Sequence, residues 1–129
     1  MTREEVNLFL KFQAKLKITY EEIGALSKKS PNDAVNKFKL KHINDMLAEA
    51  NKLLKDDYAP FKDFNVFNED DVTTNSDVVF IISPYLEALE KLRVDNIQYE
   101  GDFIGSSRSW RWTIDGKMSD METNHPRIR

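Results

Sequence analysis

Residues 77–93 constrain the fold more than any other part of the chain, because they form its most apolar stretch. Their apolar side chains recur at helical spacing, and further apolar residues widen the resulting stripe. A segment that is apolar nearly all round predicts an element at the centre of the fold. The stripe consists of Val78, Ile82, Tyr85, Leu89 and Leu92, with Val79, Ile81, Leu86 and Ala88 beside it.

Pro84 leaves two structures open for this segment. Proline has no backbone N–H and disfavours helical angles at Ser83 before it. One alternative is a continuous helix over residues 77–93 that bends at Pro84. The other is a short buried strand over residues 78–82, followed by a helix that Ser83 caps. We prefer the helix, because so short a strand needs neighbours with which to pair.

Two capping boxes, in which a threonine is followed three residues later by glutamate, mark two helix starts near the N-terminus. They are Thr2 with Glu5 and Thr19 with Glu22. Two starts so close together predict a break near residues 17–19, and therefore separate helices over residues 3–17 and 20–28. The core stripe of the first consists of Val6, Phe9, Phe12 and Leu16.

A third helix is predicted over residues 31–55. Ser30 is a good N-cap, and Pro31 suits the first helical position. A regular apolar stripe follows at helical spacing. It consists of Leu40, Ile43, Leu47, Ala50 and Leu54, with Val35, Phe38, Met46 and Leu53 beside it.

The connection over residues 56–76 combines acidic and aromatic side chains. Connections of this length are uncommon in compact domains and are usually packed down or functional. We expect the aromatic residues to cover one end of the helical core. They are Tyr58, Phe61, Phe64 and Phe67.

After Arg93 the apolar pattern changes from helical spacing to alternation, which predicts a hairpin of strands over residues 97–103 and 108–114. Pairing Phe103 with Arg108 sets the register. The resulting pairs are Ile97 with Ile114, Tyr99 with Trp112, Gly101 with Trp110 and Glu100 with Arg111. Both tryptophans then lie on the face towards the core.

Together these patterns predict one mainly α (α+β) domain over residues 1–114, with about four helical segments and a C-terminal antiparallel hairpin. Residues 115–129 are predicted to be a polar, mobile tail. The length of 129 residues is enough for one domain with a substantial core.

Composition excludes several classes of protein. The chain has no cysteine, so disulfides, thiol nucleophiles and cysteine-based zinc sites are impossible. The N-terminus is acidic where a signal peptide needs a basic segment, and no apolar run has the length of a membrane span. We therefore expect a cytoplasmic protein that binds no membrane.

No pattern predicts a catalytic, cofactor or metal site. His42 and Asp45 lie one helical turn apart, but such a pair is usually a surface contact. The acidic run over residues 69–71 lacks the glycine and the final glutamate of a calcium loop. We expect no cofactor and no enzymatic activity; an enzyme of unrecognised class remains an alternative.

Charge is unevenly distributed. Residues 1–55 carry 11 Lys and Arg against 7 Asp and Glu, whereas residues 56–92 carry 2 against 9. An acidic connection with aromatic residues suits a partner protein with a basic, partly apolar surface, or a second copy of the chain. The expected function is a small non-enzymatic protein-interaction module of accessory, immunity or inhibitory type. Its predicted partner-binding residues are Asp56, Asp57, Asp63, Glu69, Asp70 and Asp71.

Nucleic-acid binding is the main alternative. Residues 19–38 have the outline of a helix-turn-helix, although two lysines stand where its turn usually has glycine and an apolar residue. A winged-helix arrangement of residues 85–93 and the hairpin is a second form of this hypothesis. The basic residues that would contact the nucleic acid are Lys28, Lys29, Lys37, Lys39, Lys41 and Arg111.

Overall fold

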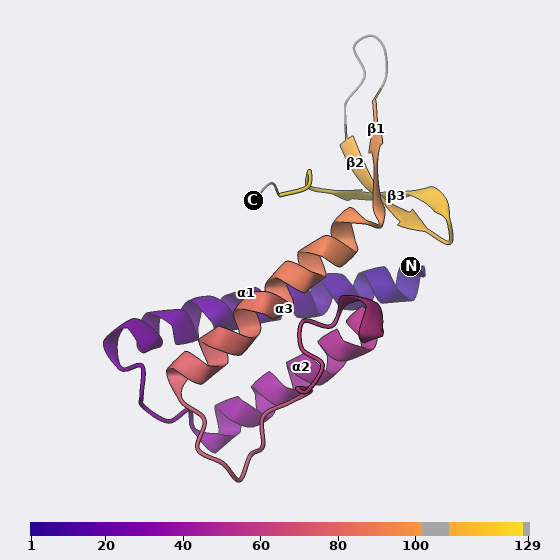
Figure 1. Ribbon diagram of the computed structural model, residues 1–129. Helices are drawn as coiled ribbons and strands as arrows, with labels where there is room; N and C mark the ends of the chain where they lie inside the picture. Colours follow the sequence, from indigo (N-terminus) through magenta and orange to yellow (C-terminus); the bar gives the residue numbers. More distant parts are fainter. Residues whose placement is uncertain (102–108, 128–129) are drawn as a thin grey trace.

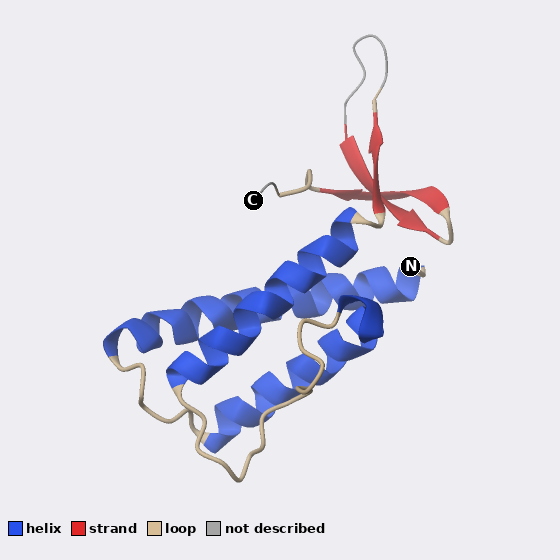
Figure 2. Cartoon of the chain, viewed as in Figure 1, coloured by secondary structure: helices blue, strands red, loops and turns tan. Residues whose placement is uncertain are grey.

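The computed structural model describes residues 1–101 and 109–127, which form three helices and one three-stranded antiparallel sheet (Figures 1 and 2). The elements in chain order are α1 (Arg3–Lys29), α2 (Lys37–Tyr58), α3 (Asn75–Val94), β1 (Ile97–Glu100), β2 (Ser109–Ile114) and β3 (Lys117–Thr123). The sheet lies at one end of the helices and is reached directly from the end of α3. The mainly helical class with C-terminal strands is confirmed; the number of helices and the size of the sheet differ from the prediction.

The predicted break in the first helix is wrong, because α1 runs without interruption to Lys29. The capping box of Thr2 and Glu5 is present as predicted. The second box does not form: the Thr19 hydroxyl donates to the carbonyl oxygen of Lys15 at 2.9 Å and so stays within the helix. A buried stripe continues past this point. It consists of Val6, Phe9, Leu16 and Ile23.

The start of α2 also differs from the prediction. Its N-cap is Asn36, whose side chain accepts from the Lys39 N–H at 2.8 Å, rather than Ser30. Residues 31–36 instead bond to the segment before α3: the Val35 N–H donates to Thr73 O at 2.8 Å. These tertiary bonds outweigh the local helix signal of Pro31. At the other end the backbone leaves helical angles at Lys55, and one further turn ends at Tyr58.

The central segment is a helix throughout, so the strand alternative for residues 78–82 is wrong. Thr74 caps α3 in a reciprocal capping box with Asp77. The predicted stripe is buried, and the stripe of α2 packs with it. Fully or almost fully buried are Leu40, Ile43, Leu47, Ala50, Leu54, Val78, Ile82, Tyr85, Leu89 and Leu92.

The sheet keeps the predicted faces but not the predicted register. Ile97 lies opposite Trp112 rather than Ile114, and Tyr99 lies opposite Trp110, so the pairing is displaced by two residues. Trp112 is fully buried and packs edge-on against Phe9 of α1 at 5.1 Å between ring centroids. The predicted pair of Phe103 with Arg108 and the turn between them lie outside the described residues.

The predicted mobile tail is wrong for most of its length, because β3 pairs with β2 along the edge of the sheet. Asp115 and Gly116 form the turn between these strands, with φ of 52° and 79°. The end of β3 is bonded to α3 by the buried guanidinium of Arg93. This group donates to the Thr123 hydroxyl at 3.0 Å and to the carbonyl of Asn124 at 2.7 Å.

Candidate protein-binding surface

The connection from Ala59 to Thr74 crosses the molecule because of how the helices run. Figure 1 shows α2 and α3 pointing in the same direction, so the chain must return along the length of α2 before α3 can start. The 22 residues of α2 span about 33 Å. An extended connection covers this distance and lies against both helices (Figure 2).

Two asparagines of α2 hold the connection in place. The Asn44 side chain donates to Phe67 O at 2.8 Å and accepts from the Phe67 N–H at 2.8 Å. Asn51 donates to Asn65 O at 2.9 Å and accepts from the Tyr85 hydroxyl at 2.6 Å. Burial raises the pKa of Tyr85 despite this bond, so the phenol remains a proton donor at neutral pH. The connection is therefore an ordered surface.

Four phenylalanines form a chain of ring contacts along this surface. Phe64 contacts Phe67 at 5.0 Å and Phe61 at 6.1 Å between centroids, both nearly edge-on. Phe61 continues the chain to Phe80 of α3 at 6.3 Å, with the two rings stacked. Phe61, Phe64 and Phe67 are partly buried and pack against the core. The predicted position at one end of the core is wrong, because the connection runs along α2 between Asn51 and Asn44.

Phe80 differs from the other three because 70 % of it is exposed. It lies on the side of α3 opposite Val78 and Ile82, which are fully buried. Pro84, one turn further on, cannot donate the hydrogen bond that the Phe80 carbonyl would receive in a regular helix.

Carboxylates neighbour the rings of the connection in sequence. Asp63 lies between Phe61 and Phe64 in the chain, and Glu69, Asp70 and Asp71 follow Phe67; all four are exposed. Among the described residues, none of these four carboxylates is part of a salt bridge. We call this surface the acidic aromatic face: Phe61, Phe64, Phe67 and Phe80 with Asp63, Glu69, Asp70 and Asp71.

The six predicted partner-binding acids lie at different points of the connection. Asp56 and Asp57 are in the last turn of α2, where the connection begins. Asp63 is in the middle, and residues 69–71 are near its other end. The structure thus distributes these acids along one segment instead of gathering them into a single cluster.

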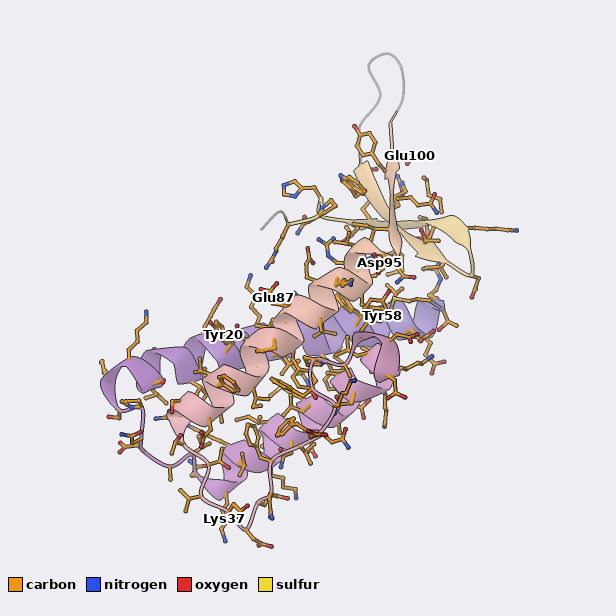
Figure 3. All side chains as sticks on the ribbon, viewed as in Figure 1. Tyr20, Lys37, Tyr58, Glu87, Asp95 and Glu100 are labelled. Carbon is orange, nitrogen blue, oxygen red and sulfur yellow. The ribbon has the colours of Figure 1, made fainter. Side chains whose placement is uncertain are left out.

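The lysines of the nucleic-acid hypothesis are brought to the end of the molecule far from the sheet. Lys28 and Lys29 end α1, and Lys37 begins α2 nearby. Figure 3 shows Lys37 at this end, with Glu100 at the opposite one. The helix-turn-helix outline itself is wrong, because its expected first helix is part of the continuous α1 and its second begins only at Lys37.

The acidic residues 69–71 lie beside these lysines. Phe67 is bonded to Asn44 and Thr73 to Val35, so the segment between them runs along the first turns of α2, which contain Lys37, Lys39 and Lys41. Negative charge at this position weakens the attraction of the lysines for phosphates.

Arg111, the sixth residue of that hypothesis, is separated from the lysines and engaged elsewhere. It lies on β2 and forms ion pairs with Glu100 and Glu122. It also donates to the carbonyl of Asp120 at 3.0 Å. These contacts hold the three strands together on the polar face of the sheet.

His42 and Asp45, the two residues of α2 considered as a catalytic pair, are not joined within the described part of the chain. No hydrogen bond joins His42 and Asp45; the His42 ring packs edge-on against Phe38 at 4.6 Å. Across residues 1–101 and 109–127, no three His, Cys, Asp or Glu side chains are placed to hold a metal ion. In the same part of the chain, no helix has the length and apolar character needed to cross a membrane.

The exposed position of Phe80 and the role of the two asparagines were not predicted from the sequence. The signal for Phe80 was present, since it falls about 200° around α3 from Val78. Asn44 and Asn51 fall on the apolar stripe of α2, where an unpaired amide would be costly. Their position could have indicated backbone partners from another segment.

In comparisons with known proteins, the chain matches no family model, no curated protein and no solved structure. The function is therefore argued from the chain itself.

Proposed function

We propose that this protein is a binding module that recognises a partner protein through the acidic aromatic face, and that it acts as a non-enzymatic accessory or inhibitory subunit. The partner carries Lys or Arg beside apolar or aromatic side chains. The observation that carries the proposal is the largely exposed Phe80 ring, which stacks on Phe61 of a connection whose exposed carboxylates form no salt bridge within the described residues.

The two components of the face have different roles. Phe80 offers a large apolar area at the centre of the contact, and it can also accept the face of an Arg guanidinium. The carboxylates attract a basic surface at long range and disfavour acidic competitors. The combination therefore selects a partner by both shape and charge.

The anchoring of the connection supports this role. A binding segment that is already ordered loses little conformational entropy when the partner docks. Asn44 and Asn51 provide this order through bonds to the backbone at Phe67 and Asn65. Affinity then depends on the side chains of the face.

The test is affinity capture of the tagged protein from its own cells, with and without nuclease, read by quantitative mass spectrometry. We expect a stoichiometric partner that survives nuclease. Phe80→Ser and the double variant Asp70→Lys, Asp71→Lys should each lose it. Phe38→Ser is the matched control, because Phe38 is 73 % exposed and lies on α2, outside this face.

Two outcomes would contradict the proposal. If nuclease abolishes capture, the lysines at the ends of α1 and α2 become the binding site. If the partner survives nuclease but is retained by both variants, binding uses a different surface.

A further inference from the structure

A second apolar surface lies between α1 and α2, on the other side of α2 from the connection. Here the helices leave a groove with a volume of about 420 Å³. Its apolar lining comes from Phe12 and Ile18 of α1 and from Met46 of α2. His42 of α2 also lines it and lies about 200° around the helix from Asn44, which holds the connection. The groove is thus separate from the acidic aromatic face.

The apolar lining of the groove is not covered by any other segment of the described chain. Ile18 is 58 % exposed, although it is a large aliphatic residue in the middle of a long helix. The Phe12 ring is flanked by two ammonium groups, Lys11 Nζ at 5.6 Å and Lys15 Nζ at 5.5 Å from its centroid. These lysines therefore lie close to the apolar lining.

The two helices that line the groove contribute opposite charges to it. Lys15 of α1 and Asp45 of α2 both line it. The two helices run in opposite directions (Figure 1). Within the described residues, neither Lys15 nor Asp45 forms a salt bridge.

We infer that this groove binds a second copy of the chain, with a two-fold axis running along the groove. Rotation about this axis places α1 of each copy over α2 of the other and keeps each residue at its level along the helix. Lys15 then faces the partner's Asp45, and Asp45 faces the partner's Lys15. The two Ile18 side chains enter the opposite groove, so one apolar contact and two pairs of opposite charges form together.

The same operation on the acidic aromatic face would bring carboxylates against carboxylates. Charge therefore assigns the second copy to the groove and leaves the other face to a different partner.

The area available sets the strength of the contact. The lining runs from Phe12 to Thr19 on α1, about 12 Å along the helix. A groove this long and two helices wide covers roughly 240 Å² per copy, so even with its flanking surface the contact stays below the about 800 Å² of a standard interface. The dimer is consequently weak and depends on concentration.

The experiment is sedimentation equilibrium of the whole chain at increasing concentration, with two charge variants. Lys15→Glu and Asp45→Lys each place like charges at both symmetry-related contacts, so each variant alone should dimerise about tenfold more weakly or not at all. A mixture of the two should dimerise again, because the glutamate introduced in one copy meets the lysine introduced in the other, and the remaining contact is the natural one. Both positions are exposed, and circular dichroism verifies that each variant folds.

Ile18→Ser gives an independent measurement, because it should weaken the dimer without changing any charge. The control Asp70→Lys should leave the dimer intact, since it alters only the acidic aromatic face. A wild-type chain that stays monomeric up to its solubility limit would overturn the inference. So would a dimer that neither charge reversal weakens, or reversed variants that remain monomeric when mixed. None of these results depends on whether the proposed partner protein exists.

Discussion

Asn44 connects the packing of the helices with the order of the candidate binding surface. Its side chain is only 8 % exposed and makes both a donor and an acceptor bond with the backbone of Phe67. Replacing Asn44 with Ala removes two hydrogen bonds, each with a net contribution of about 1 kcal/mol, and leaves two partly buried backbone groups without partners. Alanine regains about 0.5 kcal/mol of helix propensity. We expect the free energy of unfolding to fall by about 2 kcal/mol.

Two assays separate the global effect from the local one. Trp110 and Trp112 both lie on β2, at the far end of the molecule, so their fluorescence during denaturation by urea reports global unfolding. Lys62 lies exposed within the connection, so the rate of tryptic cleavage after it reports local detachment. Asn44→Ala should lower the stability and accelerate this cleavage under native conditions.

The control is Asn7→Ala, which removes the same group from an exposed position of α1. It should leave both measurements almost unchanged, or raise stability slightly through helix propensity. If Asn44→Ala behaves like Asn7→Ala in both assays, the connection is not held by Asn44, and the argument for a preordered binding face fails.

Three further predictions concern stability. Leu89 is 1 % exposed, so Leu89→Ala should lower the free energy of unfolding by about 2–5 kcal/mol. A decrease below about 0.5 kcal/mol in urea denaturation would contradict its central place. Gly24→Ala should raise the free energy of unfolding by about 1 kcal/mol, because an added Cβ would meet no atom within 4 Å; a loss would mean that α1 is strained there. Burial opposes ionisation of Glu90, but hydrogen bonds from Arg93 and the Arg127 N–H lower its pKa overall. The contribution of ionised Glu90 to the free energy of unfolding is therefore complete above the unfolded-state pKa. It is lost as the pH falls through the folded-state pKa. Stability measured from neutral to acidic pH should therefore fall less steeply in Glu90→Gln, and equal slopes would contradict this role.

The apolar stripes of the helices could be predicted because burial alone decides them. Every residue of the main predicted stripes of α2 and α3 is buried, since spacing at 3.6 residues places these side chains on one side whatever the tertiary arrangement. Two predicted positions are wrong: Phe12 of α1 is only partly buried, and Phe38, expected beside the stripe of α2, is 73 % exposed. Helix boundaries were less certain because local signals compete with tertiary bonds. Thr19 and Ser30 have the right chemistry for caps, but the first bonds within α1 and the second precedes a segment bonded to Thr73 and Asn75.

The candidate site was predicted only in part for the same reason. The sequence indicated acidic and aromatic residues in the connection, and both are on the surface of the connection. It did not indicate that Phe80 of α3 would extend the row of rings, because that contact joins residues from separate elements. A pattern within one segment reports which side is buried, but it does not report what a neighbouring segment leaves exposed.

The sheet shows where such patterns lose information. Side chains alternate with a period of two, so a displacement by two residues leaves every residue of a strand on the same face. The apolar pattern of β1 and β2 therefore fits the predicted register and the observed one equally well. The bond from the Thr113 N–H to Asn96 O at 2.7 Å fixes the observed pairing at the point where α3 ends. The signal that could have revealed β3 was the dipeptide Asp115-Gly116, which strongly favours a two-residue hairpin turn because both positions need positive φ. With β3 in place, Arg111 lies between acidic residues of both neighbouring strands, and the charges of the supposed tail become part of the sheet.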